Sequence, residues 1–243
     1  MTGPQGMGVT HPIGDDLLMG YAAGRLPAAL DLLVAAAASL DDDARARLAG
    51  FEELGGALLA LQQVAPLRDD SFEAVMERIR SAPPEETVAP DRKAPRAGAV
   101  LPGPLREAAG GDVADLPWRA AGGGARVHAL DGADGGADGA EGMARLVSIP
   151  PGAAMPRDGH GGPQVTLVLS GALRDRGARY ARGDVAVAGA AGDGAGDGAA
   201  PDAASDGAPV AEPGADCICL VVANAPARMR ALLPRLAQRF LDV

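Results

Sequence analysis

The stretch Gly152–Gly171, with the sequence GAAMPRDGHGGPQVTLVLSG, contains the most specific pattern of the chain. Asp158, His160 and Gln164 lie in its first part, and an apolar run from Val165 to Leu169 follows them. Residues two apart on a strand point to the same face of a sheet, so Asp158 and His160 are expected to lie together. Gln164 is expected to come from the next strand. The stretch therefore predicts polar side chains gathered on the inner face of an antiparallel sheet.

Short strand-like runs continue on both sides of this stretch. They cover residues 127–130, 145–149, 165–170, 184–188 and 216–222, and glycine, proline and aspartate separate them. Several short strands with turn residues between them indicate a β-sandwich or β-barrel. Two stretches rich in Gly, Ala and Asp, 131–141 and 189–209, interrupt the strands and are expected to be flexible loops.

The N-terminal part of the chain, residues 15–80, has the apolar spacing of helices instead. The first two predicted helices carry apolar residues on one face, among them Leu17, Leu18, Tyr21, Leu33 and Val34. Gly24 is expected to end the first helix, and Pro27 is expected to begin the second.

Two further helices are predicted in this part. One follows Asp41–Asp43, because acidic residues stabilise the positive N-terminal end of a helix. The other runs from about Ser71 to Arg80, where Asp70 and Glu73 resemble a capping box. The apolar faces of the four helices can all meet in one core, or part of them can remain open for a partner protein. The fourth helix is the candidate to dock elsewhere.

Residues 81–104 contain six prolines and few apolar residues, which predicts a stiff, extended linker. The chain is therefore expected to be an α + β protein of two domains. A small helical bundle would cover residues 1–80, and an antiparallel β-barrel would cover residues 105–243.

Charge and composition exclude several classes of function. The formal net charge of −10 opposes binding to the phosphates of DNA or RNA and suits docking on a basic protein surface. The first residues lack the parts of a signal peptide, and the longest apolar run, Leu32–Ala38, is too short to cross a bilayer. Cys217 and Cys219 are expected to be reduced thiols, because a disulfide at this spacing is strained. We predict a cytoplasmic protein that binds neither nucleic acid nor membrane.

The spacing of Gly152, Asp158, His160, Gln164 and Gly171 resembles the metal-binding motif of the cupin family. In cupins a histidine stands in place of Asp158 and a glutamate in place of Gln164. A last cupin histidine follows the Gly-Asp pair, here residues 183–184, but this chain has no histidine after His160. The resemblance implies a cupin-like barrel with at most a weak metal site at Asp158, His160 and Gln164.

Two separate regions resemble the ChrR-type zinc-binding anti-sigma factors. The N-terminal region runs from His11-Pro12 to Leu54-Gly55-Gly56, and the C-terminal region includes Asp115-Leu116-Pro117-Trp118-Arg119 and Asp216-Cys217-Ile218-Cys219-Leu220. The resemblance implies that the helical part sequesters an extracytoplasmic-function sigma factor and that the cupin half releases it under stress.

The same resemblance implies a zinc site in the helical part, whose first ligand position is His11. The other three positions fall on Ala37, Asp41 and Ala44. Alanine has no donor atom, and structural zinc needs four ligands, so no zinc and no other cofactor is expected here.

Three functions remain open at this point. The first is an anti-sigma factor without enzymatic activity, with Leu17, Leu18, Tyr21, Leu33 and Val34 as contacts to the sigma factor. The second is a cupin-type metal-dependent dioxygenase, which needs a metal with open coordination positions. The third is a metal-free decayed paralogue or ligand sensor, which would bind the sigma factor without a stress-dependent release.

Overall fold

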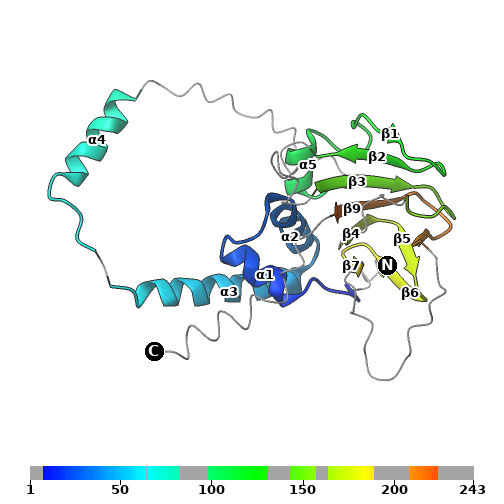
Figure 1. Ribbon diagram of the computed structural model, residues 1–243, viewed down its shortest axis with the longest axis horizontal. Coiled ribbons are helices and arrows are strands. Elements are labelled where there is room, and N and C mark those ends of the chain that lie inside the picture. The colour runs from blue at the N-terminus through cyan, green and yellow to red at the C-terminus, as the bar shows by residue number, and fades with distance from the viewer. Residues whose placement is uncertain are drawn as a thin grey trace, which may run out of the picture.

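The computed structural model describes residues 8–63, 65–82, 98–130, 143–156, 164–188 and 208–223. Helices make up the N-terminal part, and antiparallel strands make up most of the rest (Figure 1). The helices are α1 (Asp15–Ala22), α2 (Ala28–Leu40), α3 (Asp42–Ala60), α4 (Ser71–Ser81) and α5 (Gly103–Ala109). None of these helices is long and apolar enough to cross a membrane.

Local sequence signals set the ends of the first three helices. Helix α1 ends at Ala22, and Gly24 follows with a φ of +61°, a conformation that glycine adopts without strain. Pro27 is the residue before α2. The Asp41 carboxylate accepts a hydrogen bond from the Asp43 amide and caps α3. The predictions for Gly24 and Asp41 are confirmed, and α2 begins one residue after the predicted start at Pro27.

The capping box predicted for the fourth helix is wrong. Helix α4 begins after Asp70 as expected, but the Asp70 side chain makes no capping hydrogen bond. Its carboxylate lies 3.3 Å from the Arg68 guanidinium instead. The backbone of Asp70, with φ −91° and ψ 1°, also lacks the extended conformation that an N-cap residue adopts.

The strands form two antiparallel sheets. The larger sheet has the order β1-β2-β3-β9-β4-β7, and the smaller has the order β6-β5-β8. Their bounds are β1 (Arg119–Ala120), β2 (Arg126–Ala129), β3 (Met143–Ile149), β4 (Gln164–Ser170), β5 (Ala172–Asp175), β6 (Ala178–Ala181), β7 (Val185–Ala188), β8 (Val210–Ala211) and β9 (Cys217–Ala223). An isolated bridge links Ala154, which lies between β3 and β4, to Val210 of β8, and the two sheets do not close into a barrel within the described residues. The predicted antiparallel, cupin-like sheets are therefore present, but their closure into a barrel is not observed among the described residues.

Strands β4 and β9 lie side by side in the larger sheet and separate two apolar clusters. Because strand side chains alternate between the two faces, Leu167 and Leu220 lie in one cluster, and Val168 and Cys219 lie in the other. Every residue of β9 is buried, since both faces of this strand are covered.

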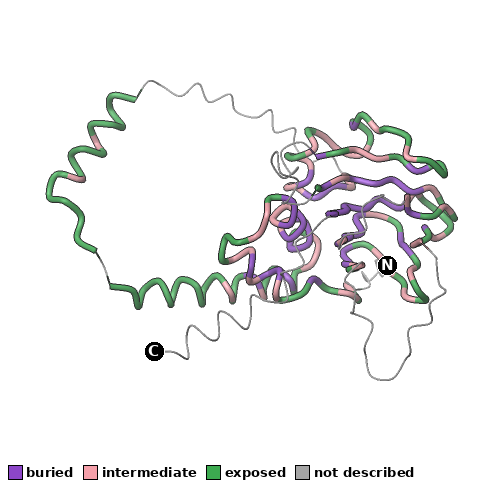
Figure 2. Tube along the Cα trace, viewed as in Figure 1, coloured by how far each residue is buried: buried purple, intermediate pink, exposed green. Residues whose placement is uncertain are grey.

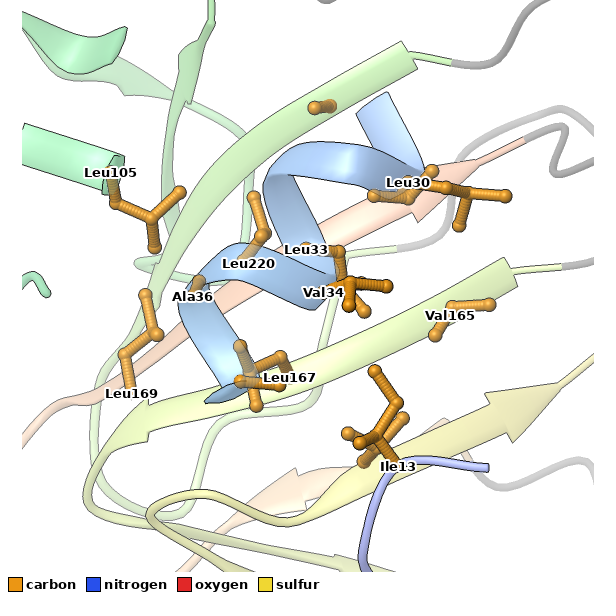
Figure 3. Close-up of a cluster of buried hydrophobic side chains, with 14 of the residues drawn as sticks. Ile13, Leu30, Leu33, Val34, Ala36, Leu105, Val165, Leu167, Leu169 and Leu220 are labelled. Atoms are coloured by element: carbon orange, nitrogen blue, oxygen red, sulfur yellow. The ribbon is translucent and has the colours of Figure 1, made fainter. Parts of the chain in front are cut away.

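Helix α2 packs on the outer face of this sheet. Figure 3 shows Leu30, Leu33 and Val34 of α2 directed toward Val165 and Leu167 of β4, with Leu220 of β9 and Leu105 of α5 beside them. One apolar cluster therefore continues from the helices to the sheet, across the predicted boundary between the two domains. The two-domain division remains a prediction.

The structure describes only part of the predicted linker and of the two predicted loops. Most of the predicted linker, residues 83–97, lies outside the described residues, as do 131–142 and 189–207, which include most of the two predicted loops. Helix α5 lies across the boundary that was predicted between linker and β-domain. Its Leu105 is fully buried against α2, so this part of the chain belongs to the core.

Candidate functional site

Large apolar side chains are exposed along the second half of α3 and on α4. Leu59 is 74% exposed and Phe72 is 70% exposed, and α4 has no buried residue. We define the open apolar face by its six large side chains: Leu54, Leu58, Leu59, Phe72, Val75 and Ile79. Figure 2 shows that exposed residues dominate these two segments, whereas much of α2 and of strands β3, β4 and β9 is buried. Soluble proteins seldom leave so many large apolar groups uncovered without an interaction partner.

A pair of glycines lies within the exposed half of α3. A Cβ atom added at Gly55 or at Gly56 would meet no atom of the described chain within 4 Å. Glycine costs about 1 kcal/mol relative to alanine inside a helix. No contact within the described residues therefore requires a glycine at either position.

The residues predicted to contact the partner lie in the core instead. Leu17, Leu18, Leu33 and Val34 are buried, and Tyr21 is half-buried against the same cluster. These side chains fasten α1 and α2 to α3 and to the sheet. Their burial does not support the expectation that they contact a partner directly.

The segment before α1 runs along the sheet and is held there by Asp184. We call residues 8–13 the N-terminal strap; it leads from α1 toward β7 (Figure 1). The Asp184 carboxylate is buried and accepts hydrogen bonds from the Thr10 amide at 2.7 Å, the Thr10 hydroxyl at 2.9 Å and the His11 amide at 2.8 Å. The Val185 amide donates to the His11 carbonyl at 2.8 Å, so the strap pairs with the start of β7.

The hydrogen bonds to Asp184 also decide its charge. Burial alone would raise the pKa of this carboxyl. The donors from Ala181, His11 and Thr10 outweigh burial and hold the pKa below its ordinary value of 3.8. Asp184 is therefore a buried carboxylate that remains ionised.

His11 lies at the edge of this contact. Its ring packs against that of Tyr180 at a tilt of 35°, with 4.4 Å between the ring centroids, and its Nδ1 is 3.8 Å from the Asp184 carboxylate. The remaining zinc positions do not fit a zinc ion. Ala37 and Ala44 are buried in the apolar cluster, and Asp41 caps α3. Two of the positions that would need zinc ligands are therefore filled by packed alanine side chains.

The cupin motif is described only in part. Gln164 begins β4, and its amide donates to the Thr166 hydroxyl at 3.2 Å and contacts the Met155 sulfur at 3.6 Å. Asp158 and His160 lie outside the described residues. Across the ranges that are described, no three His, Cys, Asp or Glu side chains gather into a group that could hold a metal. Asp158, His160 and Gln164 as metal ligands stay a prediction.

Cys217 and Cys219 lie on the inner face of β9, with 3.7 Å between their sulfur atoms. Both side chains are buried. The hydrogen bond with Cys217, together with burial, raises the pKa of Cys219 well above its ordinary value of 9.0. A reactive cysteine needs the opposite shift, so this arrangement favours inert thiols.

The sequence signals one feature of the candidate site and not the other. The spacing of apolar residues on α4 marks an amphipathic helix, and the suggestion that this helix docks elsewhere agrees with its exposure. Nothing in the sequence links Thr10 to Asp184, which lie 174 residues apart.

Comparison with known proteins agrees with this architecture. Residues 106–190 match a family model described as the ChrR cupin-like domain. The chain is 38% identical over 238 residues to the anti-sigma-E factor ChrR of Cereibacter sphaeroides, a match that covers 98% of this chain and 100% of that protein. It is also similar to a crystal structure of Rhodobacter sphaeroides SigE in complex with the anti-sigma factor ChrR. That match has a TM-score of 0.66 and 36% identity, and it covers 88% of this chain and 99% of that chain. The chain belongs to the ChrR family of anti-sigma factors.

Proposed function

We propose that this protein is an anti-sigma factor that sequesters an extracytoplasmic-function sigma factor, represses its regulon and releases it under stress. It acts by binding and has no enzymatic activity. Because sigma factors work with RNA polymerase, the proposed place of action is the cytoplasm.

The observation that carries this proposal is the open apolar face of α3 and α4. Phe72, Val75 and Ile79 recur at the three- and four-residue spacing of one helix face, and all three are exposed. Amphipathic helices bind partner proteins by laying such a face into an apolar groove. The charged residues on the other side of α4 remain solvated, so the helix can stay exposed before a partner binds.

The relatives support the choice of partner. The protein with 38% identity over almost the whole chain is named an anti-sigma-E factor, and the similar crystal structure holds ChrR bound to SigE. We therefore assign a sigma factor of this class to the open apolar face, in place of the buried residues first expected to bind it.

The test is binding of the full chain to the extracytoplasmic-function sigma factors of the same organism. We expect a stable complex, and we expect Val75→Asp to weaken it at least about tenfold, because the variant places a charge in an apolar contact. Val187→Asp is the matched control, since Val187 is also exposed, at 62% against 50% for Val75, but lies on β7. Neither variant should lower the unfolding temperature.

The outcomes separate the alternatives. If the wild-type chain binds no sigma factor, the proposed function is wrong. If Val75→Asp binds as well as the wild type, the binding surface is elsewhere. Stoichiometric iron, manganese or nickel in the purified protein would favour the dioxygenase. Binding that no stress condition reverses would favour the decayed paralogue.

A further inference from the structure

We propose that Asp184 is a latch through which the cupin-like sheets hold the N-terminal strap and, with it, the helices that bind the sigma factor. Opening of this latch would loosen the grip on the partner. The inference rests on the proposed function, but its first step concerns the free protein alone.

The latch joins two distant parts of the chain through a single buried carboxylate. Three of its hydrogen bonds come from the strap, at Thr10 and His11, and one comes from the Ala181 amide at 2.8 Å. A carboxylate that is removed from water is costly unless donors surround it. The strap supplies most of these donors, so the buried charge of Asp184 and the docked strap stabilise each other.

A second contact fixes the strap at the same place. A Cβ atom at Gly183 would lie 2.7 Å from a methyl group of Val9, and the φ of Gly183 is +92°. Only glycine allows both the backbone turn and the close approach of the strap. The Gly183-Asp184 pair is thus shaped to receive residues 9–11.

The latch is connected to the interior of the cupin-like part. The Gly183 amide donates to the Val168 carbonyl at 2.8 Å, and the Val168 amide donates to the Asp184 carbonyl at 3.0 Å. The side chain of Val168 is buried together with Cys219 in the apolar cluster on the face of the sheet opposite to α2, which we call the inner cluster. A change of packing inside the cluster would therefore move the turn that carries Asp184.

The strap is also connected to the binding helices. Ile13 is buried in the apolar cluster between the helices and the sheet. The Arg47 guanidinium of α3 donates to the Ile13 carbonyl at 3.2 Å. Arg47 also pairs with Asp15 at the start of α1. Since α3 carries Leu54, Leu58 and Leu59, a strap held in place orients the helix that presents the open apolar face.

The first measurement is hydrogen exchange of the free full-length chain. Asp184→Asn keeps the shape of the side chain but replaces one acceptor with a donor that faces the donors of the strap. We expect exchange at the His11 and Val185 amides to rise by about 10- to 100-fold, the factor that corresponds to one hydrogen bond to a charged group. The inner strands β4 and β9 should keep their protection.

Asp112→Asn is the matched control. The Asp112 carboxylate also accepts hydrogen bonds from backbone amides, those of Val100, Leu101 and Val113. It holds residues 98–101 rather than the strap, so strap exchange should not change. Thr10→Val removes only the hydroxyl bond and provides a milder test if Asp184→Asn fails to fold.

The second measurement is dissociation of the complex with the sigma factor. Asp184→Asn should speed dissociation by about fivefold or more, which is the lower end of coupling between two sites, and Asp112→Asn should not. Unchanged strap exchange in Asp184→Asn would overturn the latch itself. Faster strap exchange with unchanged dissociation would overturn the coupling. A wild-type chain that binds no sigma factor would instead refute the proposed function and leave the exchange result to decide the latch.

Discussion

Gly55 offers a test in which stability and binding should change in opposite directions. At 100° per residue, Gly55 lies inside the arc that Leu54, Leu58 and Leu59 span on α3, whereas Gly56 lies about 60° outside it. Both glycines border open space, so an alanine fits at either position in the free chain. Each substitution removes the flexibility of a glycine from a helix interior.

The stability effect follows from helix propensity. Gly55→Ala and Gly56→Ala should each stabilise the second half of α3 by about 1 kcal/mol, which slows local opening about fivefold. The binding effect follows from packing. An added methyl group in a closely packed contact costs about 1–3 kcal/mol, so Gly55→Ala should weaken sigma binding by about 5- to 150-fold. Gly56→Ala should leave the affinity within about twofold.

The assay combines hydrogen exchange over residues 52–61 of the free chain with a titration of the sigma factor. The expected pattern is slower exchange in both variants and weaker binding in Gly55→Ala alone. Tighter binding by Gly55→Ala would mean that the glycine only makes the helix flexible, and the reasoning about close approach would be refuted. Equal losses in both variants would place the contact on a different face of α3.

Three further predictions concern stability, thiol chemistry and metal. Leu33→Ala should lower the free energy of unfolding by about 2–5 kcal/mol in a denaturant titration, because Leu33 is fully buried between the helices and the sheet. A loss below about 1 kcal/mol would contradict that packing. Cys217 and Cys219 should resist alkylation in the folded protein at pH 8 and react after unfolding, because both are buried and the raised pKa keeps Cys219 protonated at this pH. Rapid labelling of the native protein would argue against the buried pair. Treatment with a chelator should change neither the unfolding temperature nor sigma binding, since Ala37 and Ala44 cannot ligate zinc; a loss of stability that zinc restores would contradict this expectation.

The sequence predicted the helices and the main strands because their signals are local. Gly24, Pro27 and Asp41 act on the backbone within one helical turn, and the alternating residues of β4 and β9 fit a sheet that is covered on both faces. Helix α5 was missed because its short sequence lies among prolines and is stabilised by the burial of Leu105. The hairpin of β5 and β6 was missed because its strands are short and rich in arginine.

The candidate site was harder to predict for a physical reason. Helical spacing identifies which side of a helix is apolar, but it does not identify what covers that side. Leu33 and Phe72 both lie on the apolar face of a predicted helix, yet Leu33 is fully buried and Phe72 is 70% exposed. The difference comes from the tertiary structure, because α2 packs on the sheet and α4 does not. The hydrogen bonds between Thr10 and Asp184 likewise depend on the folded chain.

The position of α2 has a consequence for how such proteins can evolve. Leu30, Leu33 and Val34 form part of the core of the helices and also cover the sheet at Leu167 and Leu220. A gene rearrangement that joined these helices to another sensor would expose an apolar sheet on one product and an apolar helix on the other. An exchange of modules would therefore have to be accompanied by substitutions that give both the sheet and α2 a new apolar cover.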